Sequence, residues 1–281
     1  MIVSASPPPV TPLPGLPPLG IGTWRLGEAP SKARQEIGAI QAALDHGLTL
    51  IDTAEMYADG GAEELVGEAI KGRRDQCCLV TKVMPQNASS KGTRTACERS
   101  LRRLGTDVID LYLLHWRGRH PLAETVDALR RLADDGLIRR WGVSNFDLAD
   151  MRELAALEQA QECAVNQVYY SLSERGIEYD LKPWLDGHGI VTMAYCPLDE
   201  GRLPRHHGLQ AIAAGYGASP AQVALAWLVS RGSTWAIPMT SSAERAAENA
   251  AALSLSLAPQ TLAELDTLFP PPEQKTRLKI V

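Results

Sequence analysis

Short apolar runs alternate with longer amphipathic segments along the chain between Gly20 and Pro238. The short runs are rich in apolar and β-branched residues, as buried strands are, and the longer segments repeat apolar residues at helical spacing. The runs predict eight strands, over residues 20–24, 49–52, 77–82, 108–115, 140–144, 164–167, 190–195 and 233–238. Helices are predicted between them, for example over residues 31–46, 122–135 and 220–231.

Eight strand–helix units predict an α/β protein built as a single (β/α)8 TIM barrel, formed by one domain over residues 1–281. A doubly wound sheet is the alternative, but no GxGxxG motif lies between a predicted strand and a helix. Two segments fall outside the repeat. A Pro-rich stretch within residues 1–19 is expected to cover the bottom of the barrel, and residues 254–281 form a C-terminal extension with a helix over about 258–268.

Composition and charge narrow the class of protein. Of the 281 residues, 45% are hydrophobic and 22% are charged, which is typical of a globular protein with a sizeable core. The net charge of −5 argues against a nucleic-acid binder. No signal peptide or apolar run of roughly 20 residues is visible, so we expect a cytoplasmic protein without a membrane partner. We also expect a monomer, because no extended apolar surface pattern stands out.

The five cysteines predict neither disulfides nor a metal site. Their number is odd, no CxxC spacing occurs, and most of them lie in apolar segments. Reduced thiols packed in a core have this pattern. Cys196 lies closest to the candidate site described next, and we expect it to be a buried thiol rather than an oxidation-sensitive one.

Polar or ionisable residues occur at or just beyond the C-terminal ends of the predicted strands. They are Asp52, Lys82, His115, Ser144 with Asn145, Gln167 and Tyr195. The C-terminal face of a TIM barrel carries the active site, so these side chains are expected to converge there. A buried Lys or His needs a partner, and these residues can be partners for one another.

Tyr57 lies five residues beyond Asp52, so the loop leaving that strand can carry its phenol over the mouth towards Lys82 and His115. An adjacent ammonium is expected to lower the pKa of the phenol from about 10, so that the phenol can protonate a developing alkoxide. Asp52 would keep Lys82 charged. His115 could donate a hydrogen bond to a substrate carbonyl and fix its position.

These residues lie in motifs that resemble the aldo-keto reductase family, in order and over nearly the whole chain. The motifs are Asp52-Thr-Ala-x-x-Tyr57, Lys82, Leu-Leu-His115-Trp116, Gly-Val-Ser144-Asn145 and Asn166-Gln167. Segments 47–63 and 175–180 are similar to the bacterial methylglyoxal reductase branch. The resemblance implies NADPH-dependent reduction of small aldehydes or ketoaldehydes such as methylglyoxal. It also implies a catalytic set of Asp52, Tyr57, Lys82 and His115, with Tyr57 as general acid.

The resemblance further implies how the nicotinamide is held. Ser144, Asn145 and Gln167 match the residues that bind its carboxamide, and Tyr195 matches the aromatic that stacks on its ring. Amides and a hydroxyl suit the donors and acceptors of a carboxamide, and a flat ring fixes which face gives hydride. The other coenzyme contacts implied near the strand ends are Gly22, Thr23, Trp24, Asp52, Pro197 and Leu198.

Segment 237–249 resembles the phosphate and adenine site of the family. Thr240, Ser241 and Arg245 would bind the 2′-phosphate of NADPH with help from a helix N-terminus. Glu248 and Asn249 correspond to adenine contacts. Met239 stands where many members have a lysine against the phosphates, which predicts a weaker affinity for NADPH or a smaller preference over NADH.

Trp24 and Trp116 follow strands one and four, where they could form apolar walls around a substrate held by Tyr57 and His115, although core packing explains them equally well. The loop after His115 is short, which favours small aldehydes. Two other functions fit part of the pattern. Lys82 could form a Schiff base, as in barrel aldolases. A coenzyme-sensing protein could keep the site without turnover, although the complete catalytic set favours the reductase.

Overall fold

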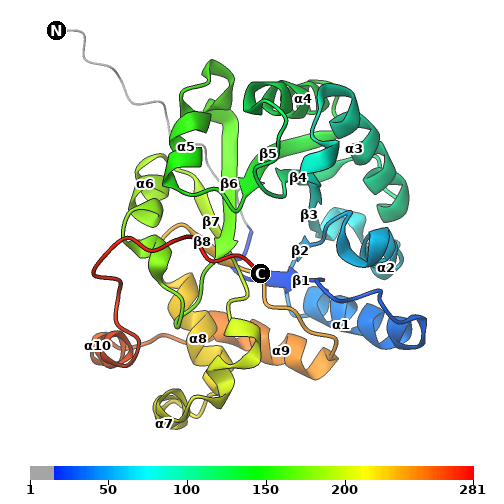
Figure 1. Ribbon diagram of the computed structural model, residues 1–281. Coiled ribbons are helices and arrows are strands. Elements are labelled where there is room, and N and C mark those ends of the chain that lie inside the picture. The colour runs from blue at the N-terminus through cyan, green and yellow to red at the C-terminus, as the bar shows by residue number, and fades with distance from the viewer. Residues whose placement is uncertain (1–15) are drawn as a thin grey trace, which may run out of the picture.

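The computed structural model describes residues 16–281, apart from the side chain of Gln159, so most of the predicted N-terminal cover lies outside the described residues. Eight parallel strands pair in the order of the sequence (Figure 1). They are β1 Gly20–Gly22, β2 Leu50–Asp52, β3 Cys78–Val83, β4 Ile109–Leu114, β5 Ile138–Ser144, β6 Cys163–Tyr169, β7 Val191–Tyr195 and β8 Thr234–Ala236. Parallel bridges from Leu19 to Ala236 and from Gly22 to Met239 join the last strand to the first.

The predicted (β/α)8 barrel is therefore confirmed, and every predicted strand agrees with the observed one to within two residues at each end. Short buried runs marked the strands well because a parallel strand covered by helices is apolar on both faces. The first strand ends at Gly22, two residues earlier than predicted, so that Trp24 lies in the following turn.

Ten α-helices lie among the described residues. They are α1 Ala33–Asp45, α2 Gly61–Ala69, α3 Ser90–Leu104, α4 Leu122–Asp134, α5 Leu148–Ala155, α6 Leu181–Gly187, α7 His207–Gly215, α8 Pro220–Val229, α9 Ala243–Ala251 and α10 Pro259–Leu268. Short 3-10 helices are η1 Pro30–Lys32, η2 Tyr57–Gly60, η3 Arg74–Gln76, η4 Pro85–Asn87, η5 Glu158–Glu162, η6 Gly176–Glu178, η7 Asp199–Gly201, η8 Leu203–Arg205 and η9 Ala252–Ser254.

Local sequence explains where several helices begin. Helix α8 starts with Ser219 and Gln222 in a reciprocal capping box, which satisfies two otherwise free backbone N–H groups, and Pro220 in its first turn has no N–H to satisfy. Across residues 16–281, no single helix has the length and apolar character needed to cross a membrane; α7 and α8 meet the criterion only as a pair joined by an 83° bend.

Two apolar layers hold the barrel together. Along β4, Leu111 and Leu113 point into the barrel interior, where they pack with residues such as Val80 and Met193. Tyr112 and its alternating neighbours point outward into the larger layer beneath the helices. This alternation follows from the two-residue period of a strand, and it leaves the polar residues at the strand ends above a filled core.

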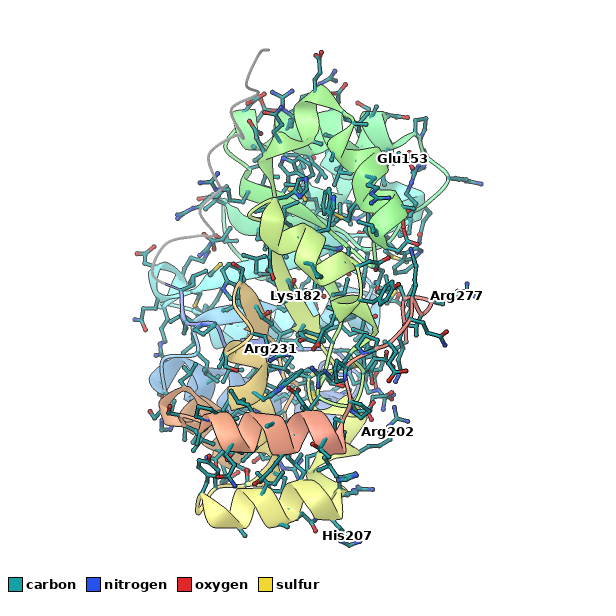
Figure 2. All side chains as sticks on the ribbon, turned by 90° about the vertical axis from the view of Figure 1, so that its left-hand side faces the viewer. Glu153, Lys182, Arg202, His207, Arg231 and Arg277 are labelled. Atoms are coloured by element: carbon teal, nitrogen blue, oxygen red, sulfur yellow. The ribbon has the colours of Figure 1, made fainter. Side chains whose placement is uncertain are left out.

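The C-terminal extension contains the helix predicted over about 258–268, observed as α10. Helix α10 lies alongside α7 at the edge of the barrel (Figures 1 and 2), and the Tyr216 hydroxyl bonds to Thr261 Oγ1 at 2.6 Å. The chain that follows α10 returns to the centre of the barrel mouth (Figure 1). The extension thus has two parts: α10, which packs on the outside of the barrel, and the chain after it, which lies near the C-terminal ends of the strands.

Candidate active site

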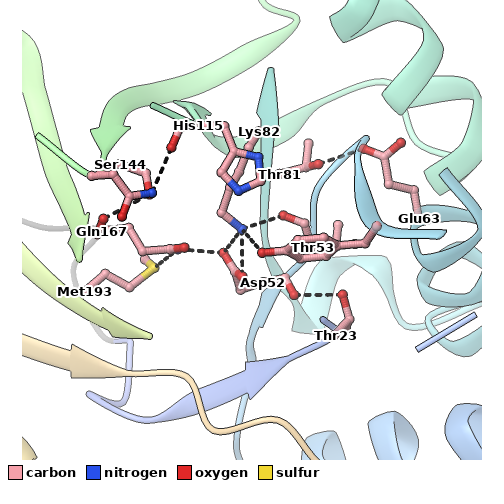
Figure 3. A network of polar contacts seen from close by, with 12 residues as sticks. Thr23, Asp52, Thr53, Glu63, Thr81, Lys82, His115, Ser144, Gln167 and Met193 are labelled. Carbon is pink, nitrogen blue, oxygen red and sulfur yellow. Dashed lines mark hydrogen bonds and ion pairs between the residues drawn. The ribbon is translucent and has the colours of Figure 1, made fainter. Parts of the chain in front are cut away.

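The structure brings the polar residues predicted at the strand ends into one mouth of the barrel (Figure 3). They come from successive strands: Asp52 ends β2, Lys82 lies near the end of β3, His115 follows β4, Ser144 ends β5, Gln167 lies in β6 and Tyr195 ends β7. Parallel strands in a barrel present their C-terminal ends on the same face, which is why residues far apart in sequence meet here.

Lys82 is the centre of the site. Its side chain is 0% exposed, and Nζ donates to both Asp52 carboxylate oxygens at 2.8 Å and to the Thr53 carbonyl at 2.8 Å. The same Nζ lies 3.3 Å from the Tyr57 hydroxyl. Burial lowers the pKa of Lys82 and raises that of Asp52, while their mutual attraction opposes both shifts. An ammonium held by so many oxygens is poorly placed to attack a carbonyl, which weighs against the Schiff-base alternative.

The Tyr57 phenol differs from the sequence prediction in one respect. The prediction that Lys82 lowers its pKa is wrong for this structure, because burial, followed by the charge of Asp52, raises the pKa well above its usual value. The two Asp52 oxygens are closer to the Lys82 ammonium than the phenol is, so the negative charge of Asp52 offsets the positive charge that would otherwise lower the pKa of the phenol. The phenol therefore keeps its proton at neutral pH, which is the state that a proton donor requires.

His115 lies beside the phenol. The Tyr57 and His115 rings meet edge to face, with centroids 5.9 Å apart, and the Trp116 ring follows at 4.8 Å from His115. Burial, followed by the charge of Lys82, lowers the pKa of His115 well below its usual value. The imidazole is therefore neutral and can donate one N–H to a carbonyl oxygen. Among the described residues, its Nδ1 has no hydrogen-bond partner.

A connected set of amides and hydroxyls runs from β7 back to Asp52. The Tyr195 hydroxyl donates to Asn145 Oδ1 at 2.8 Å, and Asn145 Nδ2 lies 3.2 Å from Ser144 Oγ. Ser144 Oγ donates to the Gln167 carbonyl at 2.9 Å, and Gln167 Nε2 donates to Asp52 Oδ1 at 2.7 Å. These groups match the chemistry of a nicotinamide carboxamide, and they are joined to the lysine–carboxylate pair through one hydrogen bond.

The end of β1, the turn that follows it and the loop after β7 contain the other implied coenzyme contacts near the mouth. Thr23 is fully buried and donates to the Asp52 carbonyl at 3.0 Å, so its hydroxyl holds the barrel wall. Trp24 is half-buried, with the Arg25 guanidinium 4.5 Å from its ring centroid. Gly22 allows close approach of the chain after β8, because a Cβ there would lie 2.9 Å from the Ile237 carbonyl oxygen.

The loop after β7 is unusual in its backbone. Pro197 is buried and Leu198 is half-buried, and around them Cys196, Asp199 and Glu200 have positive φ angles of 49°, 49° and 53°. Such left-handed conformations at non-glycine residues are costly and occur often at ligand-binding loops.

The segment after β8 lies at the other end of the implied coenzyme site. Ser242 caps α9, where its Oγ accepts from the Arg245 backbone N–H at 3.2 Å, and Arg245 itself is exposed. Ser241 is half-buried, and its carbonyl accepts from Gln35 Nε2. Thr240 is buried, and its Oγ1 accepts from the Ser242 N–H at 3.1 Å, so this hydroxyl is engaged in its own loop.

The two residues predicted to contact adenine lie further along α9. Asn249 is buried and Glu248 is half-buried. Met239 is 42% exposed, which is uncommon for a large apolar side chain. Because the residue is a methionine, this position carries no positive charge.

Two buried acids that support the site were missed from the sequence. Glu63 is fully buried; it accepts from Thr81 Oγ1 at 2.6 Å and from Arg103 at 3.1 Å. Glu55 accepts from the Met84 N–H at 2.8 Å and from Arg99 at 3.0 Å. Both tie the segment that carries Tyr57 to its neighbours. No local pattern marks these two acids, because Asp52, Asp59 and Glu64 lie in the same stretch; their burial and partners identify them, since buried acids need partners.

Comparisons with known proteins agree with this geometry. The model of the Aldo/keto reductase family matches residues 18–269. Methylglyoxal reductase YeaE of Escherichia coli (strain K12) is 49% identical over 271 residues, 95% of this chain and 95% of that protein. Glyoxal reductase of Bacillus subtilis (strain 168) is 33% identical over 257 residues, 90% of this chain and 89% of that protein. A solved aldo/keto reductase from Klebsiella pneumoniae in complex with NADP and acetate has a TM-score of 0.93 and 50% identity, covering 95% of this chain and 96% of that chain. The chain therefore belongs to the aldo/keto reductase family.

Proposed function

We propose that this protein uses NADPH to reduce small aldehydes and ketoaldehydes such as methylglyoxal to alcohols, with Tyr57 as proton donor. The observation that carries the proposal is the contact of Lys82 Nζ with both Asp52 and the Tyr57 hydroxyl, beside a neutral His115. The names of two relatives, a methylglyoxal reductase and a glyoxal reductase, support the substrate class.

NADPH supplies the hydride when it is bound. We assign its carboxamide to Ser144, Asn145 and Gln167, and its nicotinamide ring to the face of Tyr195. Pro197 and Leu198 in the loop after β7 would line its path, together with Gly22 at the end of β1 and Thr23 and Trp24 just after it. Thr240, Ser241 and Arg245 would bind the 2′-phosphate, with Glu248 and Asn249 at the adenine. The Klebsiella pneumoniae structures with NADP and with NADPH support this coenzyme.

The residues of the chain perform the proton transfer. The Tyr57 phenol gives its proton to the oxygen of the reduced carbonyl, and Lys82 stabilises the phenolate that remains. Asp52 keeps Lys82 oriented through both carboxylate oxygens. His115 donates a hydrogen bond that fixes the carbonyl oxygen near the phenol, and this positioning lowers the entropic cost of reaction.

The walls of the mouth favour a small substrate. Trp24 and Trp116 are both half-buried and can contact an aldehyde held between Tyr57 and His115. We also propose that the protein acts as a cytoplasmic monomer without a nucleic-acid or membrane partner. Size-exclusion chromatography with light scattering would check the monomer, and a stable dimer would contradict it.

A direct assay tests the proposed function. Purified protein is mixed with methylglyoxal and NADPH, loss of NADPH absorbance is followed, and the product alcohol is identified by mass spectrometry. We expect turnover with methylglyoxal and with other small aldehydes. NADPH that binds tightly without turnover across the panel would favour the coenzyme-sensing alternative. A lysine adduct trapped by borohydride with a carbonyl substrate would favour the Schiff-base alternative.

Arg245→Met tests the coenzyme assignment. We expect the Kd for NADPH to rise about tenfold, since loss of one charge-assisted phosphate contact is worth about 1.4 kcal/mol, while the Kd for NADH stays unchanged. Isothermal titration with both coenzymes measures this, and Arg102→Met, an exposed arginine on α3, is the matched control. An equal loss of affinity for NADH would contradict the assignment.

Met239→Lys tests the same site in the opposite direction. A lysine at this half-exposed position would place an ammonium where the phosphates are proposed to lie, so we expect the preference for NADPH over NADH to increase several-fold. Steady-state KM values for both coenzymes would check it. An unchanged ratio would show that position 239 does not face the phosphates.

A further inference from the structure

Residues 275–281, which we call the C-terminal strap, cross the mouth of the barrel. After α10 ends at Leu268, the chain turns back and reaches the centre of the mouth, shown in red in Figure 1. The backbone of Val281 lies against the Tyr195 hydroxyl, and that hydroxyl donates to Asn145 Oδ1 at 2.8 Å. The strap therefore reaches the residues to which we assign the nicotinamide.

The chain that leads into the strap is firmly anchored at the end of α10. The buried Arg175 guanidinium donates to Asp266 at 2.7 Å and to the Phe269 carbonyl at 2.6 Å, and it also binds both carboxylate oxygens of Glu178. Arg175 lies in segment 175–180, which is similar to the methylglyoxal reductase branch and has no part in the proposed chemistry. It fixes the point at which the chain leaves α10.

The strap itself is held by basic residues on an acidic rim. Lys275 Nζ lies 3.1 Å from Asp180. Lys279 Nζ lies 3.6 Å from both Glu174 and Asp199. The Lys279 side chain is 35% exposed and that of Glu174 is 28% exposed, so these ion pairs are partly solvated. Partly exposed pairs are weak, and a strap held by them can open while the anchored chain at the end of α10 stays in place.

Lys279 also connects the strap to the proposed coenzyme site. Its ammonium lies 4.3 Å from the centroid of the Tyr169 ring, and Tyr169 packs edge to face against Tyr195 with centroids 5.4 Å apart. The Tyr169 hydroxyl donates to Asp199 at 2.6 Å, within the strained loop after β7. Burial acts to raise the pKa of Asp199, but hydrogen bonds from Arg202 and Tyr169 and the charge of Lys279 outweigh it and lower the pKa. Asp199 is thus a charged partner at neutral pH.

We propose that Lys279 is a positioning residue that fastens the C-terminal strap over the nicotinamide end of the site, so that NADPH enters and leaves when the strap opens. This inference rests on the proposed use of NADPH. A closed strap also places the apolar side chains of Ile280 and Val281, which are 56% and 58% exposed, at the mouth. When Lys279 makes these contacts, the strap is attached both to the loop after β7, through Asp199, and to the Tyr169–Tyr195 pair. The closed strap then covers the entrance to the site.

Lys279→Met tests this role, because methionine keeps much of the aliphatic stem and removes the charge. We expect NADPH association and release, followed by stopped-flow tryptophan fluorescence, both to be about three- to tenfold faster, as fits the loss of partly exposed ion pairs. The Kd should change much less, since a gate affects both directions. Hydrogen exchange of residues 275–281 in the free protein should also increase.

Two further variants make the test specific. Lys279→Arg keeps the charge and should restore wild-type rates. Arg277→Met removes a neighbouring cation that points away from the barrel (Figure 2) and has no ion pair within the described part of the chain, so it should behave as wild type. Unchanged NADPH rates in Lys279→Met would overturn the inference even if strap exchange increased. Wild-type protein that bound no NADPH would overturn the proposed function and this inference together.

Discussion

Tyr57→Phe should reduce kcat for methylglyoxal by about 10²- to 10⁴-fold, which is the usual contribution of a positioned general acid. Phenylalanine keeps the ring that packs against His115 and removes only the proton donor. Lys82 retains its bonds to Asp52 and to the Thr53 carbonyl, so the barrel and the coenzyme site should stay intact. Steady-state NADPH oxidation, together with NADPH titration, measures both parts.

The control for this prediction is Tyr179→Phe. This variant also removes a tyrosine hydroxyl, but from a residue that is 50% exposed. It should leave kcat unchanged. Since the pKa of Tyr57 lies well above its usual value and that of His115 well below, neither group should titrate in kcat between about pH 6 and 8. A Tyr57→Phe protein with kcat within twofold of wild type would rule out the proposed proton donor.

Lys82→Met should lower the free energy of unfolding by about 3–5 kcal/mol and abolish turnover. The variant leaves the Asp52 carboxylate buried without its cation, and removing one member of a buried pair is costly because the remaining charge is neither solvated nor compensated. Within the described residues, the Asp52 carboxylate would then keep a single side-chain donor, Gln167 Nε2. Urea denaturation followed by circular dichroism measures the loss.

Two variants separate the lost pair from lost packing. The double variant Lys82→Met with Asp52→Leu replaces both charges by apolar groups and should recover most of the stability without recovering activity. Lys71→Met breaks an exposed pair with Glu68 and should cost less than about 1 kcal/mol. A loss below about 1 kcal/mol in Lys82→Met itself would mean that the pair contributes little to the fold.

The sequence by itself determined the barrel and the identity of the strand-end residues. Strand and helix patterns are local, so the apolar runs could be placed without knowing their neighbours, and the runs ending at Asp52, Lys82 and Ser144 were located to within two residues at each end. Eight such units specify a barrel, and a barrel places the C-terminal ends of all its strands on the same face. Lys82 and His115 could therefore be assigned to one mouth before any distance was known.

The tertiary structure decided how these residues act on one another. The direction of the Tyr57 pKa shift depends on burial and on the two Asp52 oxygens that reach Lys82 first, and neither is encoded in local sequence. Gln167 reaches Asp52 across 115 residues of chain, and Lys279 meets Asp199 only because residues 270–281 fold back from α10. Electrostatic energies vary steeply with distance and exposure. The sequence thus identifies the residues of the site, and the packing of distant segments determines their protonation states, their hydrogen-bond partners and their exposure.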